Sequence, residues 1–431
     1  MKEVNVGLLG VGTVGSGVVK ILNDNAEIIK KRLGFDLKLK RVCSKSVDDD
    51  VKEIVKDIFT DSYEDLFKDD IDIVVELVGG YDFPKEFILK AIEHGKSVVT
   101  ANKALLARYG FEIFSKAFDK KVDVGYEASV AGGIPIIKAV KESLSANNIQ
   151  YIKAIVNGTC NYILTEMEKS QADFESVLKD AQEKGFAEAD PTFDIDGIDS
   201  AHKMAILSSI SFGDNVVESD VFTEGIRDIT LLDIKFASEF GYKIKLLGMT
   251  RLIDNKIDVR VHPTMVRKSD VLANTDGEYN AIKVKCDMDD DTVYVGKGAG
   301  SLPTASAVVA DLMDIARNIR HDSHLRTPLM SFPFNYVKKR EIVDINELEM
   351  DYYIRFSVED SVGVLSKISG ILGDNNISIK SVVQLNKGEG WVPLIVVTHK
   401  AKEKNMQNAL KAIHKLDVIK DKTLLIRIDD E

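Results

Sequence analysis

A glycine-rich turn near the start of the chain constrains the fold more than any other feature. It follows an apolar, strand-like run over residues 4–9, opens a helical pattern, and consists of Gly10, Val11, Gly12, Thr13, Val14 and Gly15. In such a turn the first glycine permits the sharp bend, the second lets the backbone approach a pyrophosphate, and the third allows close helix–strand packing. The N–H groups at the helix start then face the phosphates. We therefore expect these six residues to bind a dinucleotide, the alternative being a glycine turn without a ligand.

The first 130 residues alternate β-branched runs with helical patterns. Strands are expected at 4–9, 37–43, 71–78, 97–100 and 122–126, with helices between them such as 17–33 and 84–94. This alternation predicts parallel strands joined by right-handed crossovers. The chain is thus expected to be an α/β protein that begins with a Rossmann-type, doubly wound nucleotide-binding domain over residues 1–130.

The pattern changes in the middle of the chain. Residues 131–304 mix helical stretches (134–144, 174–185, 200–212) with strand-like runs, which predicts an α+β domain. An amphipathic helix over 305–320 is expected to pack back on the nucleotide-binding domain and complete it. Residues 321–350 show little periodicity and are interpreted as a linker.

The final segment, 351–431, is expected to form a domain of its own. Its predicted order is strand, helix, strand, strand, helix, strand, over 352–358, 364–375, 377–384, 391–398, 403–416 and 423–428. That order is the ferredoxin-like unit. Because the segment has no acid–base cluster, we expect it to bind a ligand or to associate with another subunit.

Composition narrows the functional class. The 431 residues carry 57 Lys and Arg against 69 Asp and Glu, a net charge of −12, which argues against general nucleic-acid or membrane binding. No apolar run reaches the length of a membrane-spanning helix, and the strand-like start leaves no room for a signal peptide. Three cysteines without a CxxC pair fit a reducing compartment and make zinc binding improbable. We expect a cytoplasmic enzyme.

Two segments bear on the cofactor. The second predicted strand is followed by no carboxylate before Asp48, whereas Arg41 and Lys45 could accept a 2′-phosphate, so NADP(H) is favoured over NAD(H). The alternative is that Lys45 is a solvated loop charge. A second glycine-rich loop, 296–304, contains Gly300 at a predicted helix start and suggests close approach to a ligand, unless it is a plain connecting loop.

Polar residues elsewhere suggest proton transfer. Thr100 and Lys103 follow a short strand at the edge of the sheet where ligands bind, although a lone lysine is more often a surface residue. Five carboxylates fall within residues 188–199, and Asp199 and Lys203 share a helix face. An EF-hand is excluded because its twelfth position would be Lys203. A solvated acidic loop remains the alternative to a pocket for a small substrate that carries an ammonium group.

The segments 7–18, 99–103, 126–136, 156–163, 185–191 and 298–305 together resemble homoserine dehydrogenases, and 360–368 resembles an ACT domain. The resemblance implies reversible, NAD(P)-dependent conversion of L-aspartate 4-semialdehyde to L-homoserine, a step of threonine and methionine biosynthesis. By position, Lys203 resembles the proton donor and Lys103 a second active-site lysine beside substrate and nicotinamide. Substrate-binding roles are implied for Glu188, Asp194 and Asp199.

The same resemblance implies further ligands. A sodium ion is expected on backbone oxygens of Glu127, Val130, Gly132 and Ile134. The ACT domain implies an amino-acid effector, threonine being favoured over a purely structural role, and a homodimer or homotetramer. Cys160 and His202 depart from the family pattern without removing a reacting group. The competing functions are a non-catalytic amino-acid sensor and an amino-acid dehydrogenase or imine reductase of similar layout.

Overall fold

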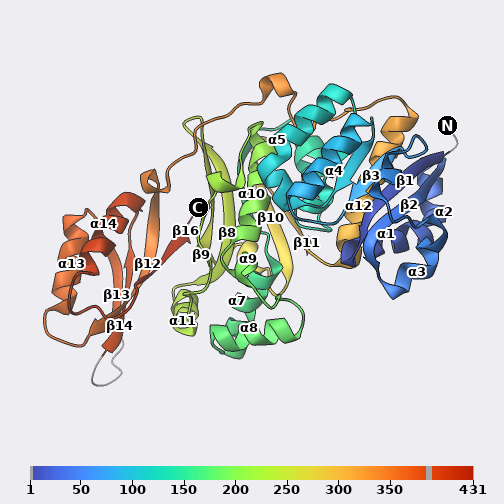
Figure 1. Ribbon diagram of the computed structural model, residues 1–431. Helices are drawn as coiled ribbons and strands as arrows, with labels where there is room; N and C mark the ends of the chain where they lie inside the picture. Colours follow the sequence, from blue (N-terminus) through green and yellow to red (C-terminus); the bar gives the residue numbers. More distant parts are fainter. Residues whose placement is uncertain (1–2, 385–390, 431) are drawn as a thin grey trace. The chain divides into compact units, whose positions relative to one another are not determined.

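The computed structural model describes residues 3–384 and 391–430 (Figure 1). The chain divides into two compact units. The first unit comprises Met1–Gly158, Asp199–Val221 and Glu278–Arg340. The second comprises Thr159–Ile198, Phe222–Gly277 and Glu341–Glu431. Each unit is therefore assembled from segments that are distant in the sequence. Among the described residues, no helix combines the length and the apolar character needed to cross a membrane.

The first unit begins with a five-stranded parallel sheet in the order β2-β1-β3-β4-β5. Its strands are β1 (Glu3–Val11), β2 (Asp36–Val47), β3 (Ile73–Glu76), β4 (Ser97–Thr100) and β5 (Val124–Gly125). The strand order reverses between β1 and β3, and ligands of doubly wound sheets bind at such a switch point. The predicted Rossmann-type fold is confirmed.

Five helices connect these strands: α1 (Thr13–Asp24), α2 (Ala26–Leu33), α3 (Asp49–Val55), α4 (Asp82–Glu93) and α5 (Lys103–Lys120). The single helix predicted over 17–33 is wrong, because the chain breaks at Asn25, which leaves helical geometry with φ −101° and ψ 12°. Three poor helix formers in succession, Asn23, Asp24 and Asn25, explain the break. Strand β2 is longer than predicted because it pairs with β1 as far as Val11.

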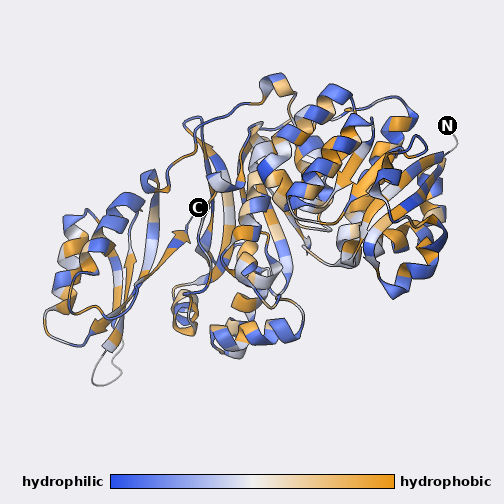
Figure 2. Ribbon diagram, viewed as in Figure 1, coloured by the Kyte–Doolittle hydropathy of each residue, from blue (hydrophilic) through white to orange (hydrophobic). Residues whose placement is uncertain are grey.

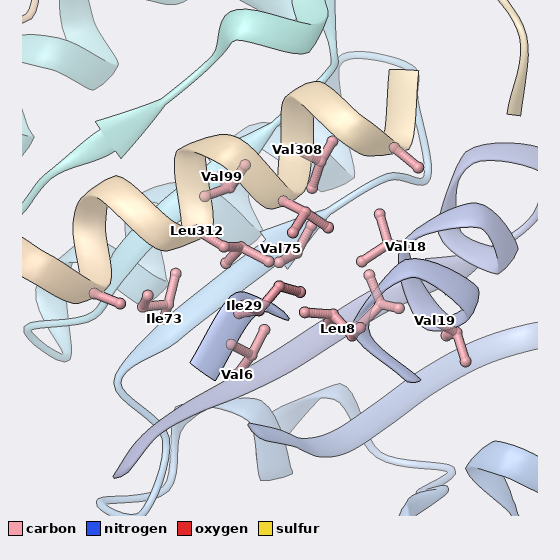
Figure 3. Close-up of a cluster of buried hydrophobic side chains, with 14 of the residues drawn as sticks. Val6, Leu8, Val18, Val19, Ile29, Ile73, Val75, Val99, Val308 and Leu312 are labelled. Atoms are coloured by element: carbon pink, nitrogen blue, oxygen red, sulfur yellow. The ribbon is translucent and has the colours of Figure 1, made fainter. Parts of the chain in front are cut away.

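A long helix from far along the chain, α12 (Ser301–Arg320), belongs to the core of this sheet. Its Val308 and Leu312 pack with Leu8 and Val75, and α1 and α12 lie against each other (Figure 3). Truncating a fully buried leucine such as Leu312 to alanine costs about 2 to 5 kcal/mol. Figure 2 shows mainly hydrophobic strands at the centre of this sheet.

The first unit also contains the antiparallel strands β11, β10 and β6, in that order. They span Asp291–Lys297, Tyr279–Cys286 and Ile149–Ile155. Helix α10 (Ile198–Phe212) is buried from Asp199 to its end. The helix predicted over 134–144 consists of the short α6 (Ile136–Lys138) and a π-helical turn, η4 (Ala139–Ser143).

The second unit has strands in the order β8-β9-β16-β12-β14-β13, with β7 beside β9 and β15 beside β12. These strands are β7 (Phe222–Thr223), β8 (Tyr242–Ile253), β9 (Lys256–Arg267), β12 (Glu349–Glu359), β13 (Ile379–Gln384), β14 (Trp391–Thr398), β15 (Ala401–Lys402) and β16 (Leu424–Asp429). The path β16-β12-β14-β13 is the predicted ferredoxin-like sheet. Its last strand, β16, also pairs in parallel with β9, a junction that the sequence did not predict.

The helices of the second unit are α7 (Gly158–Ser170), α8 (Phe174–Glu183), α9 (Thr192–Ile195), α11 (Leu231–Glu239), α13 (Val364–Asp374) and α14 (Glu403–Ile413). Helices α13 and α14 cover one face of the ferredoxin-like sheet and bury Tyr352, Ile354 and Phe356. Short 3-10 turns complete the chain at Lys56–Ile58, Tyr63–Phe67, Glu127–Ser129, Glu218–Asp220, Leu272–Asn274, Phe334–Tyr336 and Ile345–Glu347.

Candidate active site

The three glycines of the glycine-rich turn at the end of β1 have different surroundings. Gly10 has φ +93°, a left-handed conformation, and a Cβ there would lie 3.0 Å from the backbone of Leu77. A Cβ on Gly15 would lie 2.1 Å from the carbonyl oxygen of Gly10, so only glycine lets α1 pack so closely. At Gly12 an added Cβ meets nothing within 4 Å. The turn is therefore tight at its first and third glycines and open at the second, as a pyrophosphate cradle requires.

The start of α1 presents free backbone N–H groups at this open position. Gly12 is the N-cap, no side chain caps the helix, and its first turn has no acidic residue. The second glycine-rich loop reaches the same place, because Ser301 Oγ donates a hydrogen bond of 2.5 Å to the Thr13 carbonyl. Gly300, with φ +115°, is the N-cap of α12 directly before that serine. These groups fit an anionic dinucleotide phosphate.

The two basic residues proposed to bind a 2′-phosphate lie at different places along β2. Arg41 pairs with Gly7, four residues before the end of β1, and its guanidinium lies 3.0 Å from Asp70. Lys45 is exposed and lies close to Val47, the partner of Val11 beside the glycine turn. Lys45 is therefore better placed than Arg41 to meet a nucleotide at this edge.

A buried carboxylate organises the ends of β3 and β4. Glu76 is fully buried; it accepts hydrogen bonds from the backbone N–H groups of Val78 and Gly79 at 2.8 and 3.1 Å and from Thr100 Oγ1 at 2.7 Å. Thr100 Oγ1 in turn accepts from the Asn102 N–H at 3.0 Å. Sequence reasoning missed Glu76. Its one signal was a carboxylate inside an otherwise apolar buried strand.

Two lysines share one buried carboxylate in the first unit. Lys203 Nζ lies 2.6 Å from Asp199 Oδ2 and donates to the Val156 carbonyl, also at 2.6 Å. Lys103 Nζ lies 3.2 Å from Asp199 Oδ1. Asn157 Nδ2 donates to Asp199 at 2.9 Å, a contact that sequence reasoning did not assign. The structure thus brings together Lys103 and Lys203, which are 100 positions apart.

The electrostatics of this cluster follow from burial and charge. Burial alone raises the pKa of Asp199, but the ammonium groups of Lys203 and Lys103 and the hydrogen bonds from Lys203 and Asn157 outweigh burial and hold it well below its usual range. Asp199 is therefore ionised. Lys203 has 10 % of its side chain exposed and Lys103 has 35 %, so the cluster is buried at one end and open at the other.

Glu188 and Asp194 belong to the second unit. Glu188 is exposed in the turn after α8, where Gln182 Nε2 donates to its carbonyl at 3.0 Å. Asp194 is half-buried on α9, and its carbonyl accepts from Cys160 Sγ at 3.2 Å. Asp199, by contrast, belongs to the first unit.

The expected sodium loop has an unusual backbone. Ala131 and Gly132 both have positive φ, at +55° and +52°. Among the residues that the structure describes, no hydrogen bond reaches the carbonyl oxygens of Val130 and Gly132, although both residues are buried. The carbonyls of Glu127 and Ile134 accept from Val130 N at 3.4 Å and Ile136 N at 2.8 Å. Carbonyl oxygens of buried residues that lack N–H partners fit a small cation.

The ferredoxin-like sheet carries a hollow of its own. A cavity of about 400 Å³ lies at the start of α13 and is lined by Asp360, Ser361, Gly363 and Gln384, among others. Gly363 has φ +89° and is the N-cap of α13. A small amino acid fits a space of this size.

Comparison with known proteins identifies the family. The family models for homoserine dehydrogenase, for its NAD-binding domain and for the ACT domain match residues 135–313, 10–127 and 352–418. Homoserine dehydrogenases of Neisseria gonorrhoeae and Pseudomonas aeruginosa are 46 % and 43 % identical, each over 100 % of this chain and 99 % of the relative.

This chain belongs to the homoserine dehydrogenase family. The solved homoserine dehydrogenase of Thiobacillus denitrificans superposes with a TM-score of 0.94 at 46 % identity, covering 100 % of this chain and 99 % of that one. A hyperthermophilic archaeal homoserine dehydrogenase in complex with NADPH has a TM-score of 0.61 at 26 % identity, over 72 % of this chain and 97 % of that one. The predicted family, fold class and enzyme class, an oxidoreductase with an NAD-binding and an ACT domain, are confirmed.

Proposed function

We propose that this chain reduces L-aspartate 4-semialdehyde to L-homoserine with NADPH, and that Lys203 Nζ donates the proton to the carbonyl oxygen. The observation that carries the proposal is the buried Lys203–Asp199 pair with Lys103 on the other carboxylate oxygen. Burial and a neighbouring charge are the means by which proteins adapt a lysine to proton transfer. The product feeds threonine and methionine synthesis.

The residues around the carbonyl have separate tasks. Nicotinamide, when bound, supplies the hydride, so the protein needs only to bind, orient and stabilise charge. Asp199 holds Lys203 in place, and the Val156 carbonyl fixes the direction of its N–H bonds. Lys103 is the more exposed lysine. We assign it to stabilise the developing alkoxide and to contact the cofactor when it is bound.

The substrate also carries an ammonium group, which requires acidic partners. We assign Glu188 to that group, and we assign Asp194 and Asp199 to substrate binding as well. This assignment rests on the position of each residue in the family motif and on the density of carboxylates in residues 188–199.

The decisive experiment replaces Lys203 by methionine. Methionine keeps the length and apolar stem but has no proton to give, so turnover should fall by at least about 10³-fold while NADPH still binds. Turnover is followed at the nicotinamide absorbance, binding by NADPH fluorescence, and folding by thermal unfolding. A folded Lys203→Met protein with normal turnover removes Lys203 from the mechanism, and a wild-type protein inactive on the semialdehyde overturns the assigned reaction.

NADPH is favoured over NADH because Lys45 is exposed on β2 beside the glycine turn. Strand β2 ends at Val47, later than predicted, so a carboxylate, Asp48, does follow it directly. Asp48 itself accepts a hydrogen bond from Ser16 Oγ at 2.8 Å. We place Gly10 to Gly15, Thr100, Lys103 and Gly300 in the cofactor site, with Arg41 as a more remote contributor. Michaelis constants for both cofactors test this preference, and a lower constant for NADH contradicts it.

A sodium ion is proposed on the backbone oxygens of Glu127, Val130, Gly132 and Ile134. The carbonyls of the buried residues Val130 and Gly132, which accept no hydrogen bond within the described part of the chain, support it. Thermal unfolding in sodium chloride against tetramethylammonium chloride tests the site, and identical midpoints contradict it.

Threonine is proposed to bind in the hollow at Gly363 and to inhibit the enzyme. Truncating the ACT domain is a poor test, because buried Asp233 would lose its partners Tyr353 and Arg355, at 2.9 and 2.7 Å. We suggest Ser361→Trp, which fills the hollow, with Ser366→Trp as control. Loss of inhibition in the first variant alone supports the site, and an insensitive wild type contradicts regulation by threonine.

The assembly and the domain division are also proposals. We infer a homodimer or homotetramer, supported by exposed apolar side chains on and near the outer strand β11, such as Met288 and Val295. Light scattering measures the mass directly.

The proposed functional division has three domains. They are a nucleotide-binding domain over 1–130, a catalytic domain over 131–304 and an ACT domain over 351–431.

A further inference from the structure

The segment of residues 224–230, between β7 and α11, contacts two functionally different parts of the second unit. We call it the connecting segment. On one side it touches α9, the four-residue helix that carries Asp194. On the other side it touches the ACT domain.

The contacts with α9 are close and specific. Ile226 N–H donates to the Ile195 carbonyl at 2.8 Å. A Cβ on Gly225 would lie 2.2 Å from that same carbonyl oxygen, so the two backbones touch. The Arg227 guanidinium forms an ion pair with Asp196 and donates to Thr192 Oγ1 at 3.0 Å. Arg227 thereby joins the first residue of α9 to the residue that follows it.

Helix α9 needs such outside support. It has only four residues; its N-cap residue, Pro191, provides no side-chain cap, and the one preceding it, Asp190, accepts from the Thr192 N–H at 3.1 Å. A single helical turn is not stable in water by itself, because nucleation costs more than one turn of hydrogen bonds returns. The position of Asp194 therefore depends on what holds the two ends of α9.

The contacts with the ACT domain are ionic. Arg427 on β16 is 1 % exposed and binds Glu224 and Glu403, each with a shortest separation of 2.6 Å. Lys422 Nζ lies 2.7 Å from Asp228. Arg355 on β12 donates to the Asp228 carbonyl at 3.3 Å. The connecting segment is thus held by three cationic side chains of the ACT domain.

We propose that Arg227 is a positioning residue for the substrate-binding loop, and that the connecting segment links the placement of α9 to the ACT domain through Glu224 and Arg427. The inference rests on the proposed function, because it takes Asp194 to bind the substrate. It deepens that function by naming the physical link between the regulatory and substrate-binding parts.

The first experiment compares Arg227→Ala, Arg227→Lys and the control Arg267→Ala. Arg267 is a similarly exposed arginine that pairs with Asp430 away from α9. Arg227→Ala should raise KM for the semialdehyde at least about tenfold, with kcat and KM for NADPH within about threefold. Arg227→Lys should recover part of the loss, and Arg267→Ala should behave as wild type.

Hydrogen exchange supplies a readout that needs no activity. The amides of Asp194, Ile195, Asp196 and Gly197 are bonded within the α9 turn. Their exchange should accelerate in Arg227→Ala and not in Arg267→Ala. Unchanged exchange and unchanged KM overturn the positioning role. If wild-type protein does not reduce the semialdehyde, the proposed function fails, while exchange still decides whether Arg227 holds α9.

A double-mutant cycle tests the link to the ACT domain. Glu224→Gln keeps the shape but loses the charge that faces Arg427. If both residues act through one segment, the increases in KM and in exchange for Glu224→Gln and Arg227→Ala will not multiply in the double variant. Independent, fully multiplicative effects, or no effect of Glu224→Gln on exchange at α9, overturn the link.

Discussion

Lys203 Nζ lies 2.6 Å from Asp199 Oδ2, one turn earlier on the same helix. The other oxygen of that carboxylate lies 3.2 Å from Lys103, at the start of a different helix. One buried carboxylate thus holds two lysine side chains. Under the proposed function, the two ammonium groups would stabilise the alkoxide-like transition state relative to the neutral aldehyde.

Replacing Asp199 by asparagine should therefore impair chemistry more than binding of the cofactor. Asparagine can still accept one hydrogen bond, but it no longer holds Lys203 by charge. We expect kcat to fall by about 10²- to 10⁴-fold, with KM for NADPH nearly unchanged. Steady-state kinetics measure both. A kcat within threefold of wild type would show that the carboxylate is not needed to orient Lys203.

Substitution of two glycines in the same turn should affect different properties, cofactor affinity at one and stability at the other. Gly12→Val adds a side chain in open space, so stability should change by less than about 1 kcal/mol while affinity for NADPH falls at least about tenfold. Gly15→Ala places a Cβ 2.1 Å from the Gly10 carbonyl oxygen, so unfolding should become easier by about 1 to 3 kcal/mol. Chemical denaturation and NADPH titration of both variants separate the two effects. Equal stability losses would argue against an open cradle at Gly12.

Cofactor choice should respond to charge at the end of β2. Lys45→Glu places an anion where a 2′-phosphate is expected, so KM for NADPH should rise about tenfold or more, and KM for NADH should stay the same or fall. Lys40→Glu, on the same strand but before Arg41, serves as the control. If both variants raised KM for NADPH equally, Lys45 would contribute only as a general surface charge.

Stability should depend on pH through Glu127. Burial, assisted by Asp311, raises the pKa of Glu127 from 4.5 to about 7. Since the folded protein holds this proton more tightly than the unfolded chain, the stabilisation is complete below pH 4.5 and is lost as the pH rises through 7. Its size is about 1.4 kcal/mol for each pKa unit.

Glu127→Gln lacks that titration, so wild type should lose thermal stability relative to this variant as the pH is raised from about 5 to about 8. Melting curves across this range check the expectation in a buffer of constant ionic strength. Parallel pH profiles for the two proteins would contradict it.

The sequence by itself determined the elements and motifs that depend on neighbours along the chain. The glycine turn after the first strand, the βαββαβ order after residue 351, and the shared helix face of Asp199 and Lys203 are local patterns. Their spacing alone dictates geometry, because helix and strand periods are fixed by the backbone. The break at Asn25 also has a local cause in the three residues that end α1.

Only the tertiary structure decided which distant residues meet. Lys103 reaches Asp199, Glu76 reaches Thr100, β16 pairs with β9, and residues 224–230 join α9 to the ACT domain. These contacts are set by how sheets and helices pack. The sequence does not reveal them, because a charged or hydroxyl side chain such as Lys103 or Thr100 could equally have faced water. Packing the apolar faces fixes the backbone first, and the polar partners then follow from where it has brought them.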